Sequence, residues 1–163
     1  MVVRAMATGI VRVLFLVLCV TAVLNLTATS VFAADQTKVA LSGQAQTTGI
    51  TACDASVATQ SCLGQNVHFT ATVTDQKSNG NGSPLGTVFF VDESGATIGT
   101  ATLNPNGDNL SSNADFRTAL LTTTGSPHSI SATYQPSSNS WAGSTTSTSL
   151  SWPVLARLQR SRK

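Results

Sequence analysis

The sequence predicts an all-β protein, and three observations lead to this fold class. Thr, Ser, Val and Ala dominate the chain after residue 33, and β-branched side chains fit the pleated surface of a sheet. Several short segments alternate apolar and polar residues with a period of two. Clusters of Gly, Asn and Pro separate these segments at short intervals, which is typical of sandwiches and barrels.

Seven segments have the pattern of strands. The clearest is 65–75, where Val67, Phe69, Ala71 and Val73 share one face, opposite His68 and three Thr residues. The segments are 37–42, 65–75, 85–92, 97–103, 111–121, 128–135 and 141–152. The other side chains expected to point inward are Val88, Phe90, Ala114, Phe116, Thr118, Ile130, Ala132 and Tyr134. Seven short antiparallel strands are what an immunoglobulin-like β-sandwich needs.

The first 33 residues have the order of a secretory signal peptide. Basic residues at Arg4 and Arg12 accompany an apolar stretch, and a small-residue exit follows. We therefore expect a signal-peptide helix and cleavage between Ala33 and Ala34. Two alternatives are an uncleaved anchor, for which the apolar stretch is slightly short, and lipidation of Cys19.

Export leaves one pair of cysteines, Cys53 and Cys62. Paired thiols in an oxidising compartment form disulfides. A metal site needs more ligands at short spacing, and a redox site prefers Cys-x-x-Cys or a basic neighbour. The expected Cys53–Cys62 disulfide closes a short loop.

Charge excludes one class of partner. Between Ala34 and Trp152 three basic residues stand against seven acidic ones, a net charge of −4. Nucleic-acid binding requires a basic surface, so we expect no nucleic acid. The expected partners are other surface or extracellular proteins or polysaccharide, with no membrane span after signal cleavage and a secreted or cell-surface location.

Candidate chemistry is sparse, and we expect no catalysis, metal or cofactor. The adjacent carboxylates Asp92 and Glu93 point to opposite sides of a strand end, and His68 and His128 have no Ser or Asp partner in a catalytic order. The segment 104–109 is read as a hairpin turn, with a calcium site as the alternative.

Two tryptophans bracket the last expected strand. Trp141 and Trp152 are candidate ligand contacts, because exposed rings stack on sugars, but buried packing is the more common role of Trp. After Trp152 the composition changes to a basic tail. The expected domains are a signal peptide at 1–33, a sandwich at 34–152 and a disordered tail at 153–163.

Several blocks occur in a familiar order. They are Val67–Val73, Gly86–Asp92, Gly99–Leu103, Ile130–Tyr134 and Ala142–Ser147. Together they resemble bacterial Ig-like domains of the repeat group 3 type, over 37–152. The chain departs from that pattern by its long Cys-containing loop and by having a single copy. The resemblance implies an extracellular spacer, stalk or adhesion unit, or a domain appended to a secreted enzyme, and it transfers no catalytic residue.

Overall fold

A computed structural model describes residues 33–46, 59–77 and 82–157, and within them the chain forms strands and no helix. The all-β class is therefore confirmed for this part of the chain. Its strands are β1 (Thr37–Ala45), β2 (Ser61–Cys62), β3 (Val67–Asp75), β4 (Gly86–Val91), β5 (Thr97–Thr102), β6 (Asn104–Pro105), β7 (Ser111–Thr118), β8 (His128–Pro136), β9 (Ser144–Thr145), β10 (Leu150–Trp152) and β11 (Val154–Leu155).

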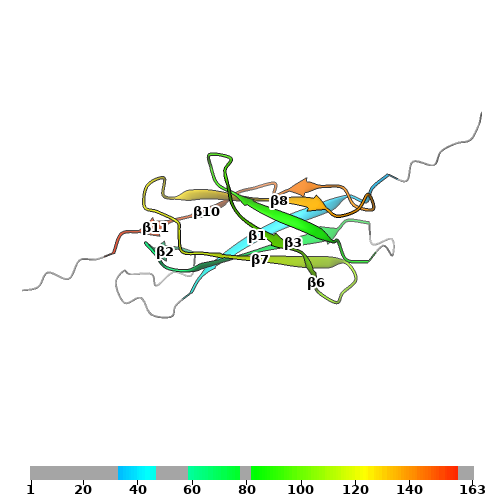
Figure 1. Ribbon diagram of the computed structural model, residues 1–163, viewed down its shortest axis with the longest axis horizontal. Coiled ribbons are helices and arrows are strands. Elements are labelled where there is room, and N and C mark those ends of the chain that lie inside the picture. Colours follow the sequence, from blue (N-terminus) through cyan, green and yellow to red (C-terminus); the bar gives the residue numbers. More distant parts are fainter. Residues whose placement is uncertain (1–32, 47–58, 78–81, 158–163) are drawn as a thin grey trace, which may run out of the picture. The chain divides into compact units, whose positions relative to one another are not determined.

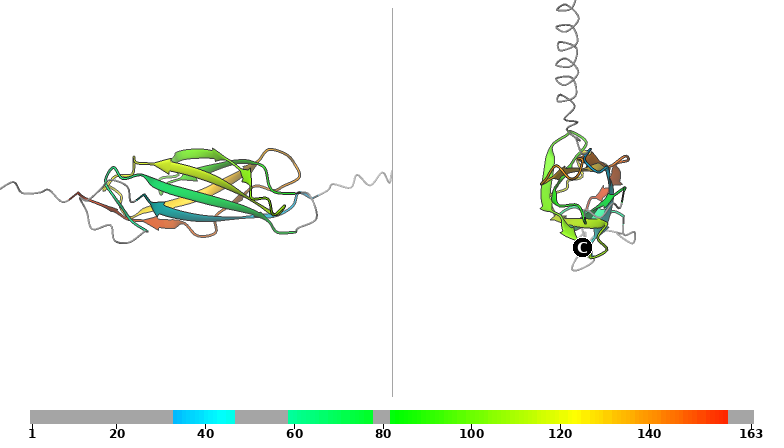
Figure 2. Two further views of the ribbon diagram at one scale, coloured as in Figure 1. Left: turned by 90° about the horizontal axis from the view of Figure 1, so that it is seen from below. Right: turned by 90° about the vertical axis from the view of Figure 1, so that its right-hand side faces the viewer.

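Two main sheets account for most of these strands. The first has the order β1–β3–β7–β6, and the second has the order β10–β8–β4–β5, with β9 also paired to β8. All of their neighbouring strands are antiparallel. Figure 1 shows them as two layers, and the view from below in Figure 2 looks onto β7, β3 and β1 side by side. A small third sheet joins β2 to β11 in parallel.

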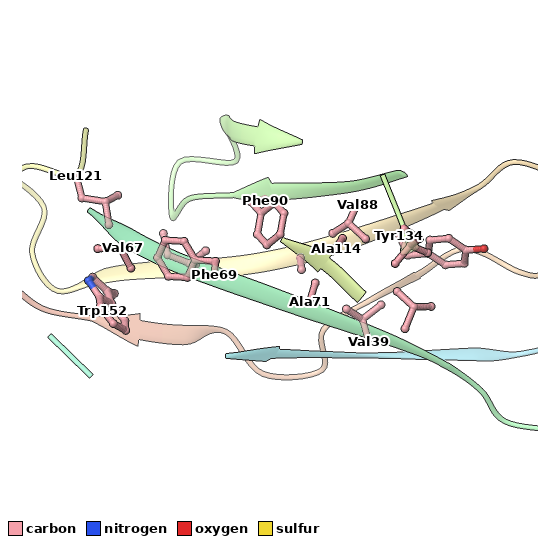
Figure 3. Packing of buried hydrophobic residues seen from close by; sticks show 14 of the residues in the cluster. Val39, Val67, Phe69, Ala71, Val88, Phe90, Ala114, Leu121, Tyr134 and Trp152 are labelled. Atoms are coloured by element: carbon pink, nitrogen blue, oxygen red, sulfur yellow. The ribbon is translucent and has the colours of Figure 1, made fainter. Parts of the chain in front are cut away.

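The apolar core lies between the two layers. Alternate side chains of β3 are buried, and those between them are half-buried, as the period of two predicts. Val88, Phe90, Ala114, Ile130, Ala132 and Tyr134 point inward as expected. Figure 3 shows Trp152, Val67 and Leu121 gathered at one end of this core and Tyr134 at the other. We call these the Trp152 end and the Trp141 end, because Trp141 lies near the start of β1 at the second.

Strand β1 is longer than predicted, and the residues just before it are held by backbone hydrogen bonds. It continues to Ala45, where Gly43 leaves room for a ring, since a Cβ there would lie 2.7 Å from Cζ3 of Trp152. The backbone of Asp35 pairs with the segment around Trp141: Asp35 N–H donates to Ser140 O (2.9 Å), and Ala142 N–H donates to Asp35 O (2.8 Å). The expected cleavage point between Ala33 and Ala34 thus lies just before the chain enters the fold.

The last expected strand was wrong as a single element. The segment 141–152 instead forms a bridge at Trp141, the short strand β9 and the short strand β10. Glycine, serine and threonine between them carry no continuous alternation strong enough to hold one long strand.

The expected boundary after Trp152 was also wrong. Strand β11 follows, its Val154 is buried, and the guanidinium Nε–H of Arg157 donates to Leu63 O at 2.9 Å. The fold therefore extends at least five residues beyond the predicted boundary, and residues 158–163 lie outside the described part.

The expected signal peptide spans residues 1–33, and because residues 1–32 fall outside the described part, its helix stays a prediction. Within the part that the structure describes, no helix has the length and apolar character needed to cross a membrane.

Candidate functional site

Both tryptophans are buried, as the packing role that the sequence favours requires. Trp152 is 0% exposed and packs edge-on against Phe69, with ring centroids 5.5 Å apart. Trp141 is 8% exposed. A ring that stacks on a sugar must present a face to solvent, and the side chain of Trp152 presents none. The packing alternative describes both side chains.

A buried hydrogen bond fixes the Trp152 end. The indole Nε1–H of Trp152 donates to Ser61 Oγ at 3.0 Å, across 91 positions of sequence. Ser61 and its neighbour Cys62 form β2, and both are 1% exposed. Cys53 lies outside the described residues, so the Cys53–Cys62 disulfide stays a prediction. If it forms, it anchors β2, the strand that pairs with β11 and accepts the hydrogen bond from Trp152.

His128 lies directly opposite Trp152 in the ladder between β8 and β10 and is buried. Its Nδ1 lies 3.1 Å from Glu93 Oε1, and its Nε2 lies 2.8 Å from the carbonyl oxygen of Thr122. A carbonyl oxygen only accepts hydrogen bonds, so Nε2 donates to Thr122 and Nδ1 faces the Glu93 carboxylate.

The two adjacent carboxylates have separate structural roles. Asp92 Oδ1 accepts from Ser94 N–H, Ser94 Oγ and Ala96 N–H, at 2.9, 2.6 and 3.0 Å, which closes the β4–β5 turn. The Ser94 hydroxyl is the main cause of the lowered pKa of Asp92. A hydrogen bond from its own backbone amide is the main cause of the lowered pKa of Glu93, and His128 adds to it.

The predicted hairpin at 104–109 is confirmed as a turn. Asp108 accepts from Leu110 N–H at 2.8 Å and from both Ser111 N–H and Ser111 Oγ, at 2.7 and 2.6 Å. The Ser111 hydroxyl is the main cause of the lowered pKa of Asp108. These bonds give the Asp108 carboxylate a structural role in the turn. Among the described residues, no cluster of His, Cys, Asp and Glu has the composition of a metal site.

The outer face of the first sheet carries charge. His68 Nε2 lies 2.8 Å from Asp115 Oδ1, and Thr70 Oγ1 donates to the same oxygen at 2.7 Å. Arg117 stands directly opposite His68 in the ladder, and Lys38 is exposed on β1. His68 points away from Val67 and Phe69, as predicted, and its carboxylate partner was not predicted.

The outer face of the second sheet carries none. Strands β4, β5, β8, β9 and β10 contain no Lys, Arg, Asp or Glu. Phe89 stands at the centre of this face, opposite Thr100 on one side and Thr133 on the other, and Thr133 meets Thr145 of β9 next. We define the uncharged face by the outward residues Thr87, Phe89, Val91, Thr100, Thr102, Ser131, Thr133 and Gln135. It is the surface best suited to contact another molecule without desolvating a charge.

Sequence reasoning missed this surface and the partners of His128. Phe89 lies between Val88 and Phe90, and strict alternation already assigns it to the opposite face from the core. The signal was therefore present for Phe89. The contacts of His128 come from Glu93, 35 positions away, and from Thr122 in a loop, and no local pattern encodes them.

No family model matches this chain, and no curated protein matches it.

Proposed function

We propose that this protein is a non-catalytic, exported module with an immunoglobulin-like sandwich fold, acting as a structural spacer or adhesion unit. One observation carries the proposal. The polar groups that most resemble catalytic parts, His128 and the carboxylates of Asp92, Glu93 and Asp108, all serve strand connections. The two antiparallel layers and the N-terminal signal pattern support the fold and the compartment.

Export and the disulfide are tested first by intact mass. The chain is produced with its own N-terminal segment, and the protein is recovered from culture fractions. The proposal expects a product that begins at Ala34. Its mass should increase by two hydrogen atoms when a reductant opens the one disulfide. A product that retains residues 1–33 at the envelope contradicts cleavage, and an unchanged mass on reduction contradicts the Cys53–Cys62 pair.

The absence of catalysis is tested on the same product. A panel of glycoside, ester and peptide substrates is incubated with the wild type and with Phe69→Ala, which removes a fully buried ring. We expect equal, background rates for both proteins. Turnover by the wild type that is lost in Phe69→Ala would identify an enzyme and overturn the proposal.

The adhesion role is tested by displaying the domain on host cells that lack it. Phe89→Lys places a charge in the uncharged face, and Ala40→Lys adds the same charge at an exposed site on β1. If the uncharged face binds, attachment falls for Phe89→Lys and not for Ala40→Lys. Attachment that is unchanged by both variants but requires the domain places the contact elsewhere, and no attachment at all leaves the spacer role.

A carbohydrate-binding module remains the second candidate, now on a different ring. Phe89 is half-buried among outward Thr side chains of β5 and β8, and an aromatic ring among hydroxyls is a combination that contacts sugars. A polysaccharide panel tests it with Phe89→Ala, and Trp141→Phe serves as the control. Binding lost in Phe89→Ala alone supports this candidate, and a panel without binding rejects it.

A further inference from the structure

The exposed edge strands of the two main sheets differ in how well they are protected against pairing with a further strand. Strand β6 is two residues long and ends in Pro105, which has no N–H to offer a new strand. Strand β10 is three residues long and is followed by Pro153. At the start of β1, Thr37 Oγ1 donates to Ala142 O at 2.8 Å, and Lys38 stands outward next to it. Strand β5 is six residues long, with neither proline nor charge.

The unpaired backbone groups of β5 follow from its register on β4. Leu103 N–H donates to Gly86 O at 2.9 Å, and hydrogen-bonded pairs alternate along an antiparallel ladder. Ala101 and Gly99 therefore bond to β4, and the amide and carbonyl of Thr100 point away from the sheet. The Thr102 carbonyl already accepts a long bond of 3.4 Å from Asn104 Nδ2. A bulge opposite Phe90 and Val91 interrupts the ladder before Gly99, so Thr100 is the centre of the free stretch.

An apolar seam runs beside this edge. Ile98 and Ala101 of β5 and Phe116 of β7 are only partly buried against the core. Phe116 stacks on Phe90 with centroids 5.2 Å apart and lies directly against Gly99, where any Cβ would overlap its ring. A strand added to β5 would cover this seam as well as pair the free backbone groups, which gives the edge both sources of affinity that strand addition uses.

The charge distribution and the sequence around Thr100 indicate which molecule pairs with the free edge of β5. Strand β7, beyond the two residues that pair with β6, carries Asp115 and Arg117. Strand β5 and the uncharged face beside it carry no charge, so two copies meet there without like-charge repulsion. An interface between identical copies must be self-complementary about a two-fold axis. Around Thr100 the sequence meets this condition, because Gly99 faces Ala101 and both residues are small.

We propose that β5 pairs antiparallel with β5 of a second copy of this chain, centred on Thr100, and joins two β10–β8–β4–β5 sheets into one continuous sheet. Thr100 of one copy then stands directly opposite Thr100 of the other, and cross-strand Thr pairs are favourable. The inference goes beyond the proposed function. A monomeric product would overturn the dimer and leave the non-catalytic module standing.

Sedimentation equilibrium of the exported product over a range of concentrations tests the proposal. We expect a reversible monomer–dimer equilibrium. Thr100→Lys places like charges opposite each other across the axis and should weaken dimerisation by about tenfold or more. Thr100→Asp should do the same. Ala40→Lys, which adds the same charge on exposed β1 of the other sheet, should leave the equilibrium unchanged.

Mixing the two charged variants keeps the test independent of folding defects. Thr100→Lys and Thr100→Asp should form a mixed dimer when combined, because opposite charges then face each other, and a misfolded protein would not be rescued in this way. Hydrogen exchange should show the Thr100 amide protected at high concentration and exchanging rapidly at low concentration. A wild type that stays monomeric, a dimer insensitive to Thr100→Lys, or no mixed dimer would each overturn the proposal.

Discussion

At one end of the two packed sheets Trp152 is 0% exposed and donates its indole N–H to Ser61 Oγ. At the other end Trp141 is 8% exposed, and its indole N–H has no hydrogen-bond partner among the described residues. Both rings come from the C-terminal third of the chain. Only the first meets a strand, β2, that supplies an acceptor from far away in the sequence.

The same contrast extends to the neighbouring polar groups. At the Trp152 end, His128 has acceptors at both nitrogens. At the Trp141 end, Ser112 Oγ is buried and has no partner in the described part of the chain, and the nearly buried carboxylate of Asp35 lies 3.6 Å from Lys77 Nζ. A buried donor without a partner loses its hydrogen bond to water and gains none within the protein, which destabilises the fold. The Trp152 end is therefore expected to be the more stable and more specific of the two.

The largest effect should come from removing the better-packed ring. Trp152→Ala should lower the free energy of unfolding by about 3–5 kcal/mol, because it empties a fully buried site beside Phe69. Trp141→Ala should cost less, since its ring is less buried and no hydrogen bond is lost. Urea unfolding of both variants measures the difference, and an equal or reversed order would contradict the comparison.

A smaller loss should follow from Ser61→Ala, which leaves the Trp152 N–H buried without an acceptor. The expected loss is about 1–3 kcal/mol. Trp152→Phe removes the donor instead, so a double-mutant cycle with Ser61→Ala isolates the hydrogen bond. A coupling energy near zero would show that this bond does not distinguish the two ends.

Alkaline pH should loosen the Trp141 end. Burial raises the pKa of Tyr134 from its usual 10.0 to about 12, while its hydroxyl donates to Leu85 O at 2.8 Å. Because the folded pKa lies above the unfolded one, the contribution of Tyr134 to stability is complete below pH 10 and is lost as pH rises toward 12. The chain contains one Tyr, so the absorbance of tyrosinate reports this group alone, and a titration midpoint near 10 would contradict the burial.

Acid should weaken a turn at each end. Hydrogen bonds to the charged carboxylates hold the pKa of Glu93 at the Trp152 end and that of Asp108 near the Trp141 end below their usual values of 4.5 and 3.8. Since the folded pKa is the lower one, each carboxylate stabilises the fold above these values, and the contribution is lost as pH falls through the folded pKa. Glu93→Gln and Asp108→Asn should each flatten the acid limb of the stability profile. Unaltered profiles would contradict the hydrogen bonds of these two carboxylates.

The smallest effect should come from Trp141→Phe. The change removes a buried N–H that has no hydrogen-bond partner among the described residues, which stabilises the fold, and it also reduces the buried ring volume, which destabilises it. Because these two effects oppose each other, the free energy of unfolding should change by less than about 1 kcal/mol. Since the chain contains two Trp residues, this variant also leaves Trp152 as the single fluorescent reporter. A loss as large as that of Ser61→Ala would show that Trp141 has a partner in solution.

Local alternation was sufficient for the regular strands. Val67 to Val73 and Ile130 to Tyr134 face the core as their period of two predicts, because neighbouring residues of a strand point to opposite sides whatever they pair with. The same rule placed Phe89 outward, although its role at the centre of an uncharged face becomes visible only when β5 and β8 are known to flank β4.

The sequence by itself determined the all-β class, the inward faces of the main strands and the low charge of the body, since these follow from local periodicity and composition. Only the tertiary structure decided that Trp152 meets Ser61, that His128 is held by Glu93 and Thr122, that β11 completes a sheet with β2, and that β5 remains an open edge. The physical reason is distance along the chain. A strand pattern specifies which face is apolar, but the partner of a buried polar group depends on which remote segment the fold brings beside it.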